Sequence, residues 1–272
     1  MKPLVASRPG FPIRLNPDAG VPSANKNIAL TNRNSTVAAK TQDKVGQQKP
    51  SSTGLGLDSL AIRMRMVQKL AAQGLTDPQV LAAMGQVERH RFIDSALVNQ
   101  AYEDTSLPIG LGQTISKPNV VARMLELLMR GEQGLQAKLG RVLEIGTGCG
   151  YQAAVLAQLA VEVYSMERLR GLHEKAIDNL RHLRLKNVHL LFGDGMLGYA
   201  KGAPYAAIIA AAGGEALPQA WIDQLAVGGR LVAPLKVANG AQALVVVDKT
   251  AQGIRQTVLE AVHFVPLKSG TS

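Results

Sequence analysis

The fold of this 272-residue chain is decided by one stretch, Arg141-Val-Leu-Glu-Ile-Gly-Thr-Gly-Cys-Gly-Tyr151. Its first half is a short apolar run without a polar face, which is typical of a strand buried on both sides of a parallel sheet. Alternate glycines follow, and residues 151–159 then have the pattern of a helix. Glycine permits a positive φ and a close approach of ligand to backbone, and the free N–H groups of a first helical turn attract polar groups. The stretch therefore predicts a nucleotide-cofactor site.

The glycine spacing separates two kinds of cofactor. The dinucleotide fingerprint is Gly-x-Gly-x-x-Gly, but here Tyr151 stands where that fingerprint needs its third glycine. Glu167 ends the next apolar run, 21 positions after Gly146, close to the spacing at which a carboxylate meets ribose hydroxyls. An adenosine-type cofactor is therefore favoured over a dinucleotide. The Gly-x-Gly-x-Gly form after Glu144 resembles motif I of the S-adenosylmethionine-dependent methyltransferases, although these residues alone leave open a glycine turn in any parallel sheet.

Composition indicates one globular domain behind a basic tail. The chain is 46% hydrophobic, which is enough for one sizeable core. Residues 1–57 hold +6 of the net charge of +10, are rich in small and polar residues, and show no period of 2 or 3.6. They are predicted to be a disordered basic tail, followed by a methyltransferase domain over residues 58–272. The tail's lysines are scattered and lack interleaved aromatic residues, which favours a solvated tail over a nucleic-acid-binding arm.

Cysteines, histidines and apolar runs argue against several other classes. Cys149 is the only cysteine, so an internal disulfide framework is excluded and a reduced, cytoplasmic setting is the default. We interpret it as a small residue in a tight turn rather than a reactive thiol. No apolar run is long enough for a membrane span, and the first 20 residues lack the apolar core of a secretory signal. The five histidines are scattered, so no metal site is predicted.

Strands alternate with helices along the chain. Helical spacing predicts helices over residues 58–73, from Pro78 onward, and over 120–129, 169–185 and 217–225. Strands are expected over 161–167, 187–193, 205–212, 230–235, 243–247 and 255–265. Residues 101–118 match neither period, and a stretch of this kind is usually functional when it is ordered. The pattern predicts an α/β fold with a doubly wound, mostly parallel sheet and an antiparallel end.

Three candidate binding positions follow predicted strands directly. Gly146, Glu167 and Asp194 each lie at the carboxyl end of one of them. Ligands of open parallel sheets bind beyond the carboxyl ends of the strands. This common location predicts one shared site.

Several segments resemble the protein-L-isoaspartate O-methyltransferases. They are AYEDTSLPIGLGQTISKPNVVARMLELL from position 101, RVLEIGTGCGYQ from 141, Gly193-Asp-Gly, Leu217-Pro, Gly228-Gly-Arg-Leu-Val-Ala-Pro and Phe264-Val-Pro-Leu. The resemblance covers roughly residues 58–268 and implies that the α/β fold is a doubly wound, mostly parallel methyltransferase (Rossmann-like) sheet with an antiparallel end and an N-terminal helical cover. It implies a repair enzyme that moves a methyl group from S-adenosylmethionine to the free α-carboxylate of L-isoaspartyl residues in damaged proteins and peptides. The ester then permits succinimide closure and partial return to normal aspartate.

The resemblance also implies roles for single residues. Ser116, in GQTIS, corresponds to the active-site serine, whose hydroxyl can orient a carboxylate that is already ionised and needs no strong general base. Spacing alone leaves open that Ser116 merely caps the following helix. The positions that correspond to cofactor-binding residues are Glu144, Gly146, Gly148, Glu167, Asp194, Gly195 and, near both cofactor and substrate, Gln242.

The chain departs from the family pattern at three places, two of which support an alternative function. Ala206 replaces an aspartate, Ala211-Ala-Gly213 replaces Thr-Ala-Ala, and Glu88 replaces a proline. The first two are expected at or near the cofactor pocket, where the lost side chains would weaken binding. The alternative is therefore a protein of the same fold that binds cofactor or isoaspartyl peptide with weak or lost catalysis. A third reading, an RNA or small-molecule methyltransferase steered by the tail, lacks a stacking platform, since only 4% of residues are aromatic.

Overall fold

The computed structural model describes residues 60–272 apart from Gln136 and Asn239. The predicted disordered tail over residues 1–57 and the start of the first helix at Asp58 lie outside the described residues. No helix in the described part of the chain is long and apolar enough to cross a bilayer.

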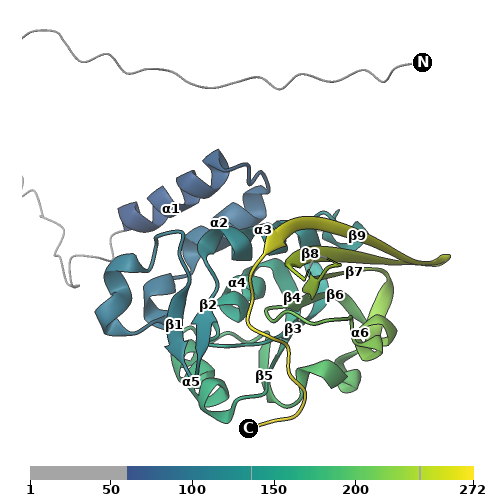
Figure 1. The fold of residues 1–272 in the computed structure, drawn as a ribbon. Helices are drawn as coiled ribbons and strands as arrows, with labels where there is room; N and C mark the ends of the chain where they lie inside the picture. Colours follow the sequence, from purple (N-terminus) through teal and green to yellow (C-terminus); the bar gives the residue numbers. More distant parts are fainter. Residues whose placement is uncertain (1–59, 136, 239) are drawn as a thin grey trace, which may run out of the picture. The chain divides into compact units, whose positions relative to one another are not determined.

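A seven-stranded sheet forms the centre of the fold, in the order β5-β4-β3-β6-β7-β8-β9 (Figure 1). The first five strands in this order run parallel, and β8 and β9 add an antiparallel hairpin at one edge. The strand order reverses between β3 and β6, which is where ligands bind in doubly wound sheets. The predicted fold class is confirmed. The strands are β3 (Leu139–Ile145), β4 (Ala160–Glu167), β5 (Val188–Phe192), β6 (Tyr205–Ala210), β7 (Leu225–Lys236), β8 (Gln242–Thr250) and β9 (Gly253–Val262).

Helices cover the two faces of this sheet unequally. The α-helices are α1 (Leu60–Ala72), α2 (Pro78–Gln86), α3 (Pro118–Met129), α4 (Tyr151–Leu159), α5 (Arg170–Arg181) and α6 (Gln219–Gln224). Short 3-10 turns are η1 (Arg89–Phe92), η2 (Ser95–Gln100), η3 (Glu132–Leu135), η4 (Gly195–Leu197) and η5 (Ala200–Gly202). Val142 of β3 packs into the larger apolar cluster with α1 to α5, whereas Leu143 packs with Trp221 of α6 on the other face. The expected strand buried on both sides is therefore present.

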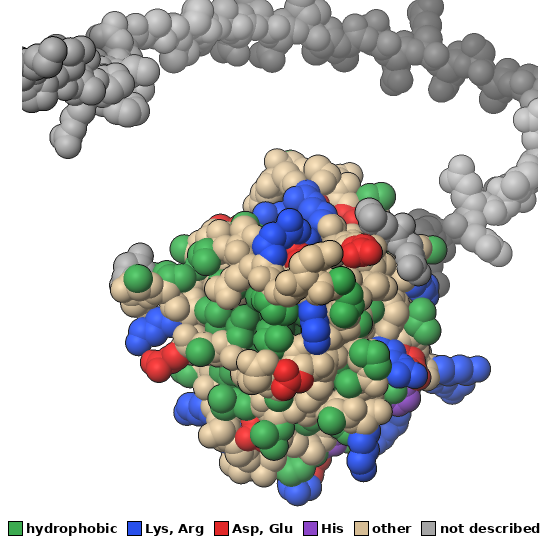
Figure 2. Space-filling view, turned by 90° about the vertical axis from the view of Figure 1, so that its right-hand side faces the viewer, with side chains coloured by type: hydrophobic (Ala, Val, Ile, Leu, Met, Phe, Trp, Pro, Cys, Tyr) green, Lys and Arg blue, Asp and Glu red, His purple; other side chains and the backbone are tan. Residues whose placement is uncertain are grey.

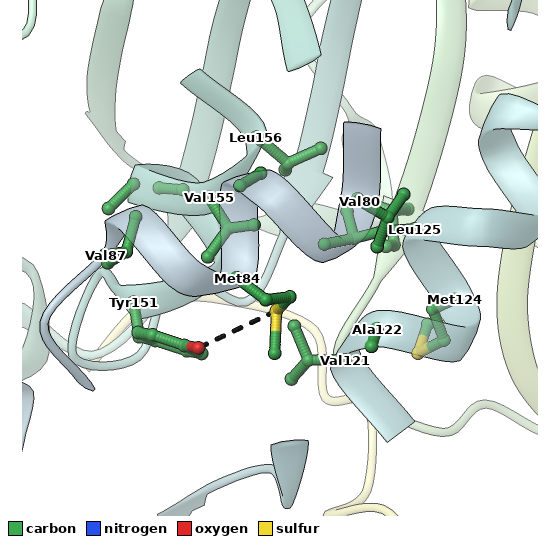
Figure 3. Close-up of a cluster of buried hydrophobic side chains, with 14 of the residues drawn as sticks. Val80, Met84, Val87, Val121, Ala122, Met124, Leu125, Tyr151, Val155 and Leu156 are labelled. Carbon is green, nitrogen blue, oxygen red and sulfur yellow. Dashed lines mark hydrogen bonds between the residues drawn. The ribbon is translucent and has the colours of Figure 1, made fainter. Parts of the chain in front are cut away.

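The N-terminal helices fix the start of α4. Val80 and Met84 of α2 pack with Val121 of α3 and with Tyr151, the first residue of α4 (Figure 3). The Tyr151 hydroxyl donates to Met84 Sδ at 3.7 Å. Asp77 caps α2 by accepting from the N–H groups of the second and third residues of that helix, as the Asp-Pro sequence predicts. The helical cover thus holds the helix that follows the glycine turn.

Residues 101–118, which match neither a helical nor a strand period in the sequence, contain a short hairpin. Strand β1 (Leu107–Gly110) pairs antiparallel with β2 (Gln113–Ile115). Strands of four and three residues are too short for alternation to be seen in the sequence. The turn between them holds Gly110, Leu111 and Gly112 at φ values of +100°, +51° and +68°.

The β8–β9 hairpin makes one side of the molecule (Figure 2). Strand β9 is the edge strand and is exposed over most of its length, with Ile254 47% and Val258 54% exposed. Figure 2 looks onto this side and shows apolar side chains gathered in the middle with basic side chains around them.

Strand β7 begins earlier than expected, because Leu225 pairs with Tyr205 before a register irregularity.

Candidate active site

A cavity of about 440 Å³ lies at the carboxyl ends of the central strands, a size typical of small-molecule sites. Its walls include the turn after β3, residues 166–169 at the end of β4, residues 211–212 after β6, the β1–β2 hairpin and residues 265–268. Gly146, Gly148, Glu167, Gly195 and Ser116 all line it. Gly146 and Glu167 thus lie on one common wall, whereas Asp194, the third position expected there, is not among the lining residues.

Three glycines line the cavity at positions that leave little room for a side chain. Gly146 and Gly148 have φ values of +91° and +57°, in the left-handed region that favours glycine. A Cβ atom at Gly148 would lie 3.2 Å from Ile109 Cδ1. Gly195 also has no room for a side chain, because a Cβ there would lie 2.6 Å from Ile145 Cγ2. These glycines keep the floor open for a ligand.

Glu167 is held between the glycine turn and α5. Its two carboxylate oxygens accept hydrogen bonds from the Gly148 N–H at 2.8 Å and the Leu169 N–H at 2.9 Å. The residue is only 5% exposed but lines the cavity. Each carboxylate oxygen has a second lone pair, so the group can also accept from a pair of ribose hydroxyls.

Glu144 lies behind the cavity wall and is fully buried. Burial raises the pKa of its carboxyl group to about 8, against the opposing effect of the Ser165 hydroxyl, which donates to it at 2.5 Å. The Ser165 hydroxyl also lies 2.6 Å from Thr147 Oγ1 within the glycine turn. Burial thus favours the protonated form of Glu144, which is linked to the turn through two hydroxyl groups.

Asp194 and Gln242 also lie outside the cavity lining and secure its walls. Asp194 accepts from the Met196 N–H at 2.8 Å and from the Gly270 N–H at 2.6 Å. Gln242 bonds both backbone groups of Phe264, at 2.6 and 3.2 Å. Figure 1 shows the segment after β9 passing over the strand ends toward the C-terminus. Both side chains thus anchor that segment.

Gly213 is explained by the same anchor. Its backbone N–H donates to Val265 at 2.8 Å, and its carbonyl accepts from Leu267 at 2.9 Å. A Cβ at this position would lie 2.3 Å from Gln242 Nε2. With Gln242 in this position there is no room for the alanine of the family pattern, which explains the glycine at position 213.

A second cavity of about 570 Å³ opens beside the first and is called the acceptor groove below. Its walls are the start of α3, residues 260–265 and Ser106. Four residues line both cavities, namely Thr114, Ser116, Ala211 and Val265. Ser116 is half-buried at this junction. The N-cap of α3 is Lys117, without a side-chain capping bond, so the interpretation of Ser116 as a helix cap is wrong.

Ala206 corrects another expectation. It lies near the amino end of β6, where a Cβ added at Gly140 would be 3.2 Å from its own Cβ, and it is not among the residues that line either cavity. Of the two departures that were expected at the cofactor pocket, at Ala206 and Ala211, only Ala211 lines a cavity. The loss of aspartate at position 206 therefore removes no group from the cavity wall.

Cys149 lines the cofactor cavity, but burial raises the pKa of its thiol, which keeps the thiol protonated.

Comparisons with known proteins decide the family. A family model described as Protein-L-isoaspartate(D-aspartate) O-methyltransferase matches residues 62–272. The chain belongs to this family. A protein-L-isoaspartate O-methyltransferase of Methylibium petroleiphilum is 54% identical over 265 residues, which is 97% of each chain. One from Leptothrix cholodnii is 61% identical over 221 residues, 80% of this chain and 77% of that one.

A solved structure agrees with the cofactor expected of a protein-L-isoaspartate O-methyltransferase. A Plasmodium falciparum structure assigned to the same enzyme class, in complex with S-adenosyl-L-homocysteine, has a TM-score of 0.66 and 25% identity over 76% of this chain and 98% of that one. The residues here fit the methylated form of that ligand. Gly146 and Gly148 leave the floor open, and Glu167 has free lone pairs for ribose. The predictions of the family, the enzyme class and S-adenosylmethionine as cofactor are confirmed.

Sequence reasoning missed the roof of the cavity. Ile109 and Leu111 of the hairpin, Leu169 before α5, Leu172 within α5, and residues 265–268 complete the walls. The hairpin lies in the 101–118 stretch that was expected to be functional, but no local pattern marks Leu169, Leu172 or residues 265–268 as parts of the same cavity. The resemblance of Phe264-Val-Pro-Leu to the family was the one available signal for the last of them.

Proposed function

We propose that Ser116 orients the free carboxylate of an L-isoaspartyl residue at the junction of the two cavities, with S-adenosylmethionine in the first cavity and the damaged protein or peptide in the acceptor groove. The observation that supports this most is the shared wall of four residues, of which Ser116 bears the hydroxyl nearest the start of α3. Methyl transfer requires donor and acceptor to meet within a short distance and in line. Two adjoining cavities with one short common wall meet that requirement.

Methyl transfer to a carboxylate needs no strong general acid or base. The acceptor carboxylate is ionised at neutral pH, and bound S-adenosylmethionine supplies an electrophilic methyl group. Ser116 would donate a hydrogen bond to one carboxylate oxygen and leave the other to react. Val265 and its neighbours, anchored by Gln242 and Gly213, would exclude water from the junction.

We assign the predicted cofactor residues to two groups. Gly146, Gly148, Glu167 and Gly195 are proposed to contact the cofactor, because they line its cavity. Glu144, Asp194 and Gln242 are proposed as positioning residues, because each bonds to a segment of the wall and none lines the cavity.

The test uses labelled S-adenosylmethionine and two peptides of one sequence, one with L-isoaspartate and one with L-aspartate. We expect methylation of the isoaspartyl peptide alone. Ser116→Ala removes a hydrogen bond to a charged group, so kcat is expected to fall about 10- to 100-fold, while S-adenosyl-L-homocysteine still binds. Ser106→Ala is the matched control, because Ser106 lines the groove but not the cofactor cavity. An unchanged kcat for Ser116→Ala would remove Ser116 from the proposed role.

We also propose a cytoplasmic location and no nucleic-acid partner. The free, buried thiol of Cys149 suits a reducing compartment. The tail's basic charge is proposed to be solvated. Strongly salt-dependent RNA binding that is lost on removal of residues 1–57 would contradict the second proposal.

A further inference from the structure

Arg89 is a buried cation without an acidic partner. It lies in η1 and is fully buried, and burial lowers the pKa of its guanidinium. The preceding residue, Glu88, which departs from the family pattern, pairs with Arg63 and Arg91 instead. Neither Nη atom of Arg89 bonds to a carboxylate in the described ranges. A buried charge that no opposite charge balances is costly to the folded state, so stability alone does not explain this residue.

The guanidinium of Arg89 packs on the first residue after the cofactor turn. Its central carbon lies over the ring of Tyr151, 4.9 Å from the ring centroid. Phe92, also in η1, contacts the same ring edge to face at a centroid distance of 5.5 Å. Tyr151 follows Gly150 directly, begins α4 and lines the cofactor cavity. Its hydroxyl is directed at Met84 (Figure 3), so η1 and α2 together fix the start of α4.

The same side chain is also bonded to the segment that leads to the acceptor groove. Arg89 Nε donates to the Ala101 carbonyl at 2.8 Å, and both residues are fully buried. Three residues after Ala101, Asp104 accepts from the Asn119 N–H at 2.9 Å, at the start of α3. Ser116 lies just before that helix and lines both cavities. One side chain thus contacts the cofactor turn and holds the segment that is fastened beside Ser116.

We propose that Arg89 is a positioning residue for methyl transfer, which sets the distance between the cofactor turn and Ser116 by joining Tyr151 to Ala101. The inference rests on the proposed function, because it requires S-adenosylmethionine in the first cavity and the acceptor carboxylate beside Ser116. Arg89 lines neither cavity, so it acts through the residues that it holds. Methyl transfer depends steeply on the distance between donor and acceptor, and a displacement of about 1 Å can cost about 100-fold in rate.

The test begins with Arg89→Met in the full chain. Methionine keeps an apolar side chain of similar length but removes the cation and the bond to Ala101. We expect kcat with the isoaspartyl peptide to fall about 10-fold, because donor and acceptor are held less well in line. Binding of S-adenosyl-L-homocysteine, measured by calorimetry, should change less than about twofold, because the cavity lining keeps all its residues.

Arg230→Met is the matched control. Arg230 is also largely buried and lines neither cavity, but it pairs with Asp248 at 2.7 Å and donates to the Leu127 carbonyl at 2.9 Å. Its loss leaves a carboxylate without its main partner, so Arg230→Met should lower the Tm more than Arg89→Met does. Measured well below its Tm, this variant should keep the kcat of the wild type.

Arg89→Lys separates positioning from a purely structural role. Lysine keeps a cation and a donor for the Ala101 carbonyl but not the planar group over Tyr151, so it should restore part of the lost kcat. An unchanged kcat in Arg89→Met, or a kcat no higher in Arg89→Lys than in Arg89→Met, would overturn the inference. A loss of cofactor affinity as large as the loss of kcat would also overturn it, since that would indicate a general disturbance of the cavity. Failure of the proposed function looks different, because Ser116→Ala would then keep its kcat while Arg89→Met still loses it.

Discussion

The two cavities that meet at Ser116 are built from different groups. The cofactor cavity has a floor of glycine backbone, and its acidic residue Glu167 is bound by two backbone N–H groups. The acceptor groove is lined by side chains of α3 and β9, among them Arg123 and Glu260, which form an ion pair at 2.7 Å across it. Backbone geometry suits a ligand of constant shape. A groove for many damaged proteins suits side chains that can move, so the two regions should respond differently to substitution.

The largest effect is expected in the cofactor cavity, at the glycine Gly195. In Gly195→Ala the new methyl group would lie 2.6 Å from Ile145 Cγ2, inside a packed core. Overpacking of this kind costs about 1–3 kcal/mol, and the shift of the wall should weaken cofactor binding at least 10-fold. Thermal unfolding and calorimetry with S-adenosyl-L-homocysteine measure the two effects.

Gly85→Ala is the control for this change. Gly85 lies in α2, where a Cβ would meet Val67 at an ordinary 3.4 Å, so helix propensity should raise the stability slightly. Unaltered cofactor affinity in Gly195→Ala would show that the floor does not need glycine there.

The second expected effect is a pH dependence of stability that comes from Glu144, the buried carboxyl group behind the cavity wall. The pKa of Glu144 is raised to about 8, from an ordinary value of 4.5, chiefly by burial. Between these values the folded state holds a proton that the unfolded state releases, so the stability of the folded state falls as pH rises and becomes level above about 8. The slope is about 1.4 kcal/mol per pH unit for one proton.

Glu144→Gln should remove this slope while it keeps an oxygen for the Ser165 hydroxyl. Denaturant unfolding between pH 5 and 9 would show the variant gaining on the wild type up to pH 8. Parallel curves for the two proteins would mean that Glu144 is ionised in the folded state.

The comparison also explains what could be predicted from the sequence. The glycine turn and Glu167 follow from local patterns at the ends of β3 and β4, since a short motif sets both backbone and ligand contacts. Ser116 came from the family resemblance, because its neighbours at the junction are supplied by β6 and by the segment after β9. The acceptor groove and the roof of the cofactor cavity form only when α3, β9 and the hairpin pack together. No local sequence period predicts that packing. For Glu144, Asp194 and Gln242, sequence gave a location near the site but not their position behind its wall.

The smallest effect is expected in the acceptor groove. Arg123 is held by Glu126, which is 1% exposed and also accepts from two backbone N–H groups, at Thr76 and Asp77. Glu260 is 44% exposed and can leave the pair. In Glu260→Gln, Arg123 should become free to attract an acidic residue that flanks the isoaspartate in the substrate. An exposed ion pair contributes little to stability, so Tm and cofactor affinity should hardly change.

Peptides with one flanking residue varied between Glu, Gln and Lys would measure this preference as kcat/KM. The variant is expected to gain about two- to fivefold for the acidic peptide over the basic one, relative to the wild type. Glu215→Gln removes an equal charge from a residue that is 86% exposed and outside both cavities, so it should leave the ratio unchanged. A shift of the ratio in both variants would assign it to the net charge of the protein. A shift in Glu260→Gln alone would assign it to the groove, and no shift in either would mean that flanking residues do not reach Arg123.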